Sequence, residues 1–210
     1  MSTRLETLIA SAIHNGKFQV VETTGPNLTD ANNNELIKGT TTSSAVNELN
    51  VTNAAASGTP VLSTSGGDTN VGMQIGAKGT GTVNVTVPFL SKKTATTITT
   101  AGAGTYAAAE ILGGIILRDP AGASRTDTTH TAAQLVAACP GAVVGSTFEL
   151  VVRNTADAAE TITVQGGTGV TISGTATIAQ NNSKLFYGVF TNVTGSSEAV
   201  TLYSVGTFVH

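Results

Sequence analysis

Residues 46–87 read VNELNVTNAAASGTPVLSTSGGDTNVGMQIGAKGTGTVNVTV and indicate the fold class of this chain. Short β-prone pieces alternate with turns rich in Gly, Asn, Asp and Thr, and only Glu48, Asp68 and Lys78 carry charge. Short runs of β-branched and aliphatic residues between such turns are typical of strands. No piece is long enough to bury both of its faces within its own chain. We therefore expect a β-rich stem whose strands pack against neighbouring copies of the same chain.

The composition of the 210-residue chain also fits a protein of strands and turns. Only 11% of the residues are charged, against roughly 25% in an average soluble domain, so solubility depends on hydroxyl and amide side chains. The net charge of -3, with Lys92-Lys93 as the one basic pair, disfavours a nucleic-acid partner. No apolar run approaches the roughly 20 residues of a membrane span, and we expect no membrane partner. The start of the chain lacks the pattern of a secretory leader, so we expect assembly in a reducing compartment.

The first residues of the chain carry the strongest helix signal. Thr3 and Glu6 have the spacing of a capping box, and apolar residues then recur at the spacing of one helix face. The residues of this predicted attachment or assembly face are Leu5, Leu8, Ile9, Ala12 and Ile13. A helix of about eleven residues is marginal alone in water. We therefore expect this face to dock, either on the body of its own protomer or on a partner surface.

A polar segment separates this helix from the stem. Residues 17–22 (KFQVVE) predict a short strand, and residues 23–44 contain the strong breakers Gly25-Pro26 and Asn32-Asn33-Asn34. This composition favours an extended arm that is either ordered by contact with a neighbour or not ordered at all. The prediction is thus a first region of helix and extended arm (1–45), followed by a β-rich fibre-like module (46–90).

Residues 91–210 are predicted to form a C-terminal antiparallel β-sandwich or barrel-like domain with one short helix. The helix is expected over 132–138, because Thr131 and Gln134 have capping-box spacing and Pro140 follows. Residues 119–122 (DPAG) predict a turn. Strands are expected at 96–100, 111–118, 146–154, 161–165, 170–173, 175–179, 184–193 and 199–209. Such spacing is typical of sandwiches and barrels.

Candidate catalytic residues are few. Asp127 and His130 are close in sequence with Ser124 nearby, but a catalytic triad requires convergence in space. We interpret these three residues as part of a solvated loop that leads into the Thr131 cap. Cys139 lies on the apolar side of the short helix, which favours a buried, inert thiol.

Metal and cofactor sites are not predicted either. Residues 76–81 (GAKGTG) lack the Gly-Lys-Ser/Thr ending of a phosphate loop, and we expect a turn there. His14, His130 and His210 are too scattered to indicate a metal site, and His210 is expected either in solvent or at a trimer axis. A single cysteine excludes an intrachain disulfide and a thiolate zinc cluster. The chain is therefore not predicted to be an enzyme.

Four motifs of the stem occur in a characteristic order. They are N-x-L-x-V-T-N-A (47–54), P-V-L-S (60–63), G-D-T-N-V-G-M (67–73) and K-G-T-G-T-V (78–83). In this order they resemble modules of bacteriophage fibre and head-fibre proteins, and residues 166–203 separately resemble C-terminal domains of phage structural proteins. The resemblance implies a homotrimeric, β-rich component of the virion.

Three function hypotheses follow. The first is a non-enzymatic capsid decoration (cement or head-fibre) protein, a trimer on the capsid exterior that is assembled in the host cytoplasm and binds the major capsid protein. The second is a short tail-fibre or tail-tip adhesin that binds host-surface glycans. The third is a glycan-cleaving enzyme, which requires acidic residues to converge at a protomer interface.

Overall fold

The structure is a computed structural model that describes residues 13–14, 17–18, 27–29, 32, 34–40 and 42–210. Contacts within the chain group Met1–Val71 into one unit and Gly72–His210 into another. The boundary between the two units falls inside the predicted module 46–90. Each unit is described below by itself.

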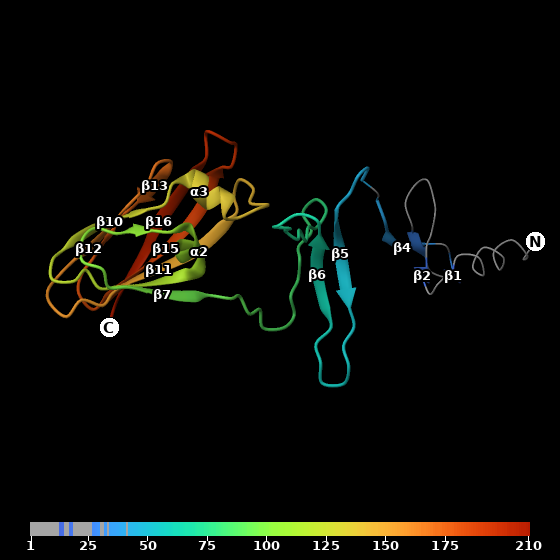
Figure 1. The fold of residues 1–210 in the computed structure, drawn as a ribbon, viewed down its shortest axis with the longest axis horizontal. Coiled ribbons are helices and arrows are strands. Elements are labelled where there is room, and N and C mark those ends of the chain that lie inside the picture. The colour runs from blue at the N-terminus through green and yellow to red at the C-terminus, as the bar shows by residue number, and fades with distance from the viewer. Residues whose placement is uncertain (1–12, 15–16, 19–26, 30–31, 33, 41) are drawn as a thin grey trace, which may run out of the picture. The chain divides into compact units, whose positions relative to one another are not determined.

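The described part of the first unit consists of three two-stranded antiparallel sheets (Figure 1). Their strands are β1 (Ile13–His14) with β2 (Lys17–Phe18), β3 (Asn27–Thr29) with β4 (Glu35–Lys38), and β5 (Asn47–Thr52) with β6 (Val61–Gly66). The β5–β6 hairpin confirms that the beginning of the stem is made of strands. In contrast, residues 67–90, all of which the structure describes, form no strand, although the whole module 46–90 was expected to be β-rich.

Two predictions for the N-terminal region are corrected. Ile13 and His14 form strand β1, so the predicted helix does not extend to them. Its other face residues, Leu5, Leu8, Ile9 and Ala12, lie outside the described residues. The predicted extended arm contains the β3–β4 hairpin, in which Leu28 pairs with Ile37. Backbone pairing within the arm itself satisfies groups that we expected a neighbour to satisfy.

The second unit contains a four-stranded and a six-stranded sheet with two short helices (Figure 1). The strand orders are β14-β12-β10-β8 and β13-β16-β15-β11-β9-β7. The elements are β7 (Thr94–Ile98), β8 (Thr105–Tyr106), α2 (Ala108–Gly113), β9 (Gly114–Arg118), β10 (Arg125–Thr129), α3 (Ala132–Ala137), β11 (Thr147–Asn154), β12 (Ile162–Gln165), β13 (Val170–Ser173), β14 (Thr177–Ile178), β15 (Asn182–Asn192) and β16 (Ala199–Val209). The described chain is therefore mainly β, as the sequence predicts.

The directions of the strands differ from the prediction. Both sheets are mixed, because β10 runs parallel to β8 and β12, β9 runs parallel to β7 and β11, and β13 runs parallel to β16. Parallel neighbours need a crossover of a dozen or more residues. Between β9 and β11 the chain forms β10 and α3, which is long enough for such a crossover. Alternation of apolar residues identifies a strand but not the direction of its neighbour.

The helices give one confirmed and one corrected prediction. In α3, the Thr131 hydroxyl accepts a hydrogen bond from the Gln134 amide at 3.3 Å, as the capping-box spacing predicts. Helix α2 instead occupies 111–113, where we expected a strand. The Glu110 carboxylate accepts a hydrogen bond from the Ala107 amide at 2.7 Å, which stabilises the helix start. Gly114, with φ of 88°, ends the helix.

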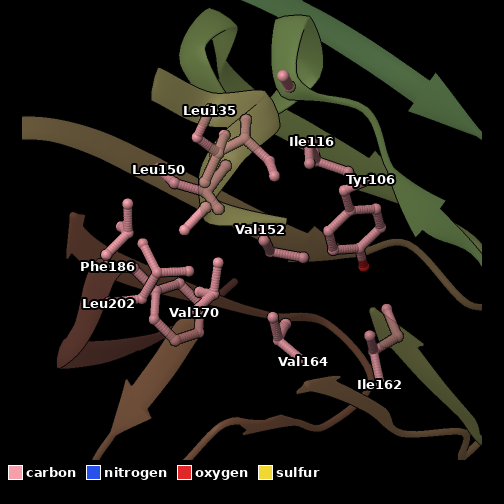
Figure 2. Close-up of a cluster of buried hydrophobic side chains, with 14 of the residues drawn as sticks. Tyr106, Ile116, Leu135, Leu150, Val152, Ile162, Val164, Val170, Phe186 and Leu202 are labelled. Carbon is pink, nitrogen blue, oxygen red and sulfur yellow. The ribbon is translucent and has the colours of Figure 1, made fainter. Parts of the chain in front are cut away.

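One hydrophobic core unites the two sheets and both helices of this unit (Figure 2). Fully buried members include Tyr106 of β8, Ile111 of α2, Ile116 of β9, Leu135 of α3, Leu150 of β11, Ile162 of β12, Ile178 of β14, Phe186 of β15 and Leu202 of β16. Gly188 lets the Phe148 ring pack directly on the backbone of β15, since an added Cβ would lie 2.2 Å from a ring carbon. The same ring packs against Phe190 with 5.6 Å between centroids.

Candidate functional site

The β5–β6 hairpin presents an apolar face that is largely exposed in the described part of its unit. Directly paired residues of antiparallel strands share a face, so the register Val51↔Leu62 and Leu49↔Thr64 places these four side chains on one side. The exposed fractions of Leu49, Val51 and Leu62 are 59%, 75% and 50%. We call Leu49, Val51 and Leu62 the stem face. An isolated two-stranded hairpin is at best marginally stable in water. We therefore expect the stem face to be buried against a partner.

The opposite face of the hairpin is polar and hydrogen-bonded within itself. The pairs Glu48↔Ser65, Asn50↔Ser63 and Thr52↔Val61 lie on this side. The Ser65 hydroxyl donates to Glu48 Oε1 at 2.8 Å. This polar face can remain exposed to solvent. The hairpin is therefore amphipathic, and only its apolar face needs a partner.

The second unit contains a buried charged cluster that the sequence analysis missed. Arg118 and Asp127 are fully buried, and Arg118 Nε donates to Asp127 Oδ2 at 2.7 Å. The Tyr106 hydroxyl donates to the same carboxylate oxygen at 2.9 Å, and the Gly104 amide donates to Oδ1 at 2.6 Å. The predicted solvated loop is therefore wrong at Asp127, which lies on strand β10. The signal was present as R-T-D-T-T, an alternating pattern with a charged residue at an inward position.

The two terminal guanidinium nitrogens of Arg118 donate hydrogen bonds to loop carbonyls. Nη1 donates to the carbonyl oxygen of Thr100 at 2.9 Å and to that of Asp119, and Nη2 donates to that of Gly102 at 2.7 Å. Five donors in one planar group allow Arg118 to bind three segments at once. The cluster therefore ties the loops around β7 and β8 to strands β9 and β10.

Electrostatics follow from this arrangement. Burial raises the pKa of Asp127. Arg118, the Gly104 amide and the Tyr106 hydroxyl together lower this pKa by more than burial raises it, so the net shift is downward. Burial and the neighbouring Asp127 carboxylate raise the pKa of Tyr106. Asp127 is thus a carboxylate and Tyr106 a neutral phenol near neutral pH. Asp127 is the charged partner of Arg118, and Tyr106 donates a hydrogen bond to that carboxylate.

The structure does not unite Asp127, His130 and Ser124 in a catalytic triad. Asp127 bonds with Arg118, Tyr106 and Gly104. His130 Nδ1 accepts a hydrogen bond from the Ala108 amide at 3.2 Å, at the start of α2. Ser124 Oγ accepts one from the Thr161 amide at 2.9 Å. Each side chain has a separate partner and holds a separate segment.

The other candidate residues also have structural partners. Cys139 is partly buried against the core, and burial raises the pKa of its thiol. Residues 78–81 form a turn closed by the Gly81 amide and the Lys78 carbonyl at 3.1 Å, as predicted. His210 is exposed, its ring lies within hydrogen-bond distance of the Ser183 hydroxyl, and its amide donates to Asn181. Among the described residues, no group of three or more His, Cys, Asp or Glu side chains could hold a metal ion.

A second exposed surface lies on the outer face of the six-stranded sheet. Tyr187 of β15 pairs directly with Tyr203 of β16, and Glu149 of β11 lies opposite Tyr187 on the other side. Tyr187 and Tyr203 are 41% and 44% exposed. A hydrogen bond to Glu149 raises the pKa of Tyr187, and Lys93 Nζ lies 3.6 Å from the Glu149 carboxylate. We call Tyr187, Tyr203 and Glu149 the tyrosine row.

No family model, curated protein or solved structure matches this chain. In the part of the chain that the structure describes, no helix is both long and apolar enough to cross a membrane.

Proposed function

We propose that this chain is a non-enzymatic structural protein of a bacteriophage virion, a homotrimer that decorates the outer capsid surface by binding the major capsid protein. In this proposal the stem face joins three protomers, and the second unit, a β-sandwich built from its two mixed sheets, projects outward. The N-terminal residues Leu5, Leu8, Ile9, Ala12 and Ile13 contribute to attachment or assembly.

The observation that carries the proposal is the uncovered stem face, in the region whose motifs resemble phage fibre modules. Burying an exposed aliphatic side chain contributes about 1.5–3 kcal/mol. Because Leu49, Val51 and Leu62 are 59%, 75% and 50% exposed, burying what remains exposed would contribute roughly 3–6 kcal/mol per protomer. Copies of the same hairpin are suitable partners because cyclic assembly also covers the free strand edges.

Replacing Val51 with Asp should convert the trimer into monomers. The new carboxylate would lie at the centre of the buried contact, where an unpaired charge is costly. Light scattering on the purified protein should report about three protomers for the wild type and one for Val51→Asp. Asn50→Asp, on the polar face of the same strand, is the matched control and should remain trimeric. A monomeric wild type, or a trimeric Val51→Asp variant, would contradict the trimer.

The location on the virion needs a separate experiment. Labelled protein should appear on the capsid shell when virions are imaged by cryo-electron microscopy. Label at the tail would refute the decoration role while leaving a virion protein.

The second candidate function is a phage adhesin that binds host glycans, and the tyrosine row favours it. The exposed rings of Tyr187 and Tyr203 provide apolar contact area, and the neighbouring Glu149 carboxylate accepts hydrogen bonds. Small-molecule sites combine the same two kinds of group. Under this function, wild-type protein should bind a glycan array saturably, and Tyr187→Ala with Tyr203→Ala should abolish binding. Thr191→Ala, exposed on the same strand, is the control. Absence of saturable binding by the wild-type trimer would remove this candidate.

A further inference from the structure

Residues 82–87 (TVNVTV) have the sequence of a strand but no strand partner in the structure. Val83, Val85 and Val87 alternate with Asn84 and Thr86, which predicts a strand with one apolar face. The segment nevertheless lies outside every strand of its unit, and the three valines are 54%, 52% and 68% exposed. An apolar face and a row of backbone donors and acceptors are thus both available to a partner.

The same unit has a free sheet edge. Strand β7 is the last strand of the six-stranded sheet and pairs with β9 alone. The Asp119 amide donates to the Ile98 carbonyl at 2.9 Å, so the backbone hydrogen-bonding groups of Ile98 face the β9 side. Successive residues of a strand point their N–H and C=O groups to opposite edges. The N–H and C=O groups of Ala95 and Thr97 therefore face the open edge. An open edge of this kind is a template for an added strand.

The side chains and charges at this edge also fit an added strand. Ile98 and Leu112 are packed against the core but only partly buried, and α2, which carries Leu112, packs beside β7. Valines on the inner side of an additional strand would extend the cover over this corner. Neither 82–87 nor Thr94–Ile98 contains a charged residue, so no like charges would oppose each other across the new pair.

We propose that residues 82–87 of one protomer add as a strand to the β7 edge of a neighbouring copy. In its own chain only six residues (88–93) separate the segment from β7, and the segment is still without a strand partner. Head-to-tail donation from each copy to the next closes into a ring when the rotation permits, and strand addition is a common mode of recognition. The inference rests on the proposed homotrimer and identifies a contact that holds it together.

Disulfide trapping between two differently tagged protomers tests the proposal. In a Cys139→Ser background, one protomer carries Asn84→Cys or Thr86→Cys, and the other carries Ala95→Cys or Thr97→Cys. After co-expression and mild oxidation, at least one combination should give a mixed-tag disulfide at a yield at least tenfold above the control. The control combines Thr86→Cys with Thr191→Cys, which lies on the exposed side of the interior strand β15.

Each outcome separates this inference from the proposed function. Trimers without a mixed-tag disulfide above the control would overturn strand donation and leave the trimer intact. A disulfide that forms only within a single chain carrying both Thr86→Cys and Thr97→Cys would also overturn it, because the strand would then fold back on its own β7. A monomeric wild type in light scattering would overturn both. Amide hydrogen exchange adds a readout without substitution: residues 83–87 should become protected in the trimer and lose at least tenfold protection in the Val51→Asp monomer.

Discussion

Replacing Arg118 with methionine should destabilise the second unit by about 3–5 kcal/mol, because it leaves the Asp127 carboxylate buried without its cationic partner. Arg118 is fully buried and binds Asp127 together with three loop carbonyls. Methionine retains most of the side-chain length, so the loss is mainly electrostatic. Chemical denaturation followed by circular dichroism should measure the change in the free energy of unfolding. Arg153→Met, at an exposed position on β11, should change it by less than about 0.5 kcal/mol.

The pH dependence of stability gives this prediction a second readout. In the wild type the pKa of Asp127 is below its ordinary value, which is about 3.9 in an unfolded chain. Its stabilising contribution is therefore complete above about pH 4 and is lost as the pH falls through the lower folded pKa. In Arg118→Met, the pKa of Asp127 should be higher than in the wild type, because Arg118 no longer lowers it while burial still raises it, so acidification should relieve part of the destabilisation. Equal acid dependence in the two proteins would contradict the role assigned to this ion pair.

Replacing Phe186 with alanine should cost about 3–5 kcal/mol of unfolding free energy, the range for removal of a buried aromatic side chain. Phe186 is fully buried in the core that joins the two sheets (Figure 2). Its neighbour Tyr187 points to the opposite face of the same strand and is 41% exposed. Tyr187→Ala is therefore the matched control, and it should cost less than about 1 kcal/mol. Similar losses for both variants would indicate that the outer face of the sheet is buried in the assembled protein.

The strands of the second unit were largely predictable from sequence, for a local reason. Strand β16 (Ala199–Val209) coincides with its prediction, and β13 (Val170–Ser173) does as well. Both follow glycine-rich or polar turns and consist mainly of residues that favour strands. The α3 helix was predictable because the Thr131–Gln134 cap is a contact between residues three apart.

The buried cluster was not predictable in the same way. Arg118 and Asp127 are nine residues apart on strands of different sheets, and the expected loop had the polar composition of an exposed segment. A charged residue becomes a core residue only when its partner lies on a neighbouring element, and that depends on the fold of the whole unit. The parallel pairing of β9 with β7 and β11 has the same origin.

By itself, then, the sequence of this protein indicated a mainly β chain, the positions of strands such as β13 and β16, and the capped start of α3. Those properties depend on backbone preferences and on side-chain spacing within a few residues. The tertiary structure alone decided the mixed direction of the sheets, the burial of Arg118 with Asp127, the open edge of β7, and the lack of a strand partner for residues 82–87. These features depend on contacts between residues distant in the chain, which local preferences do not specify.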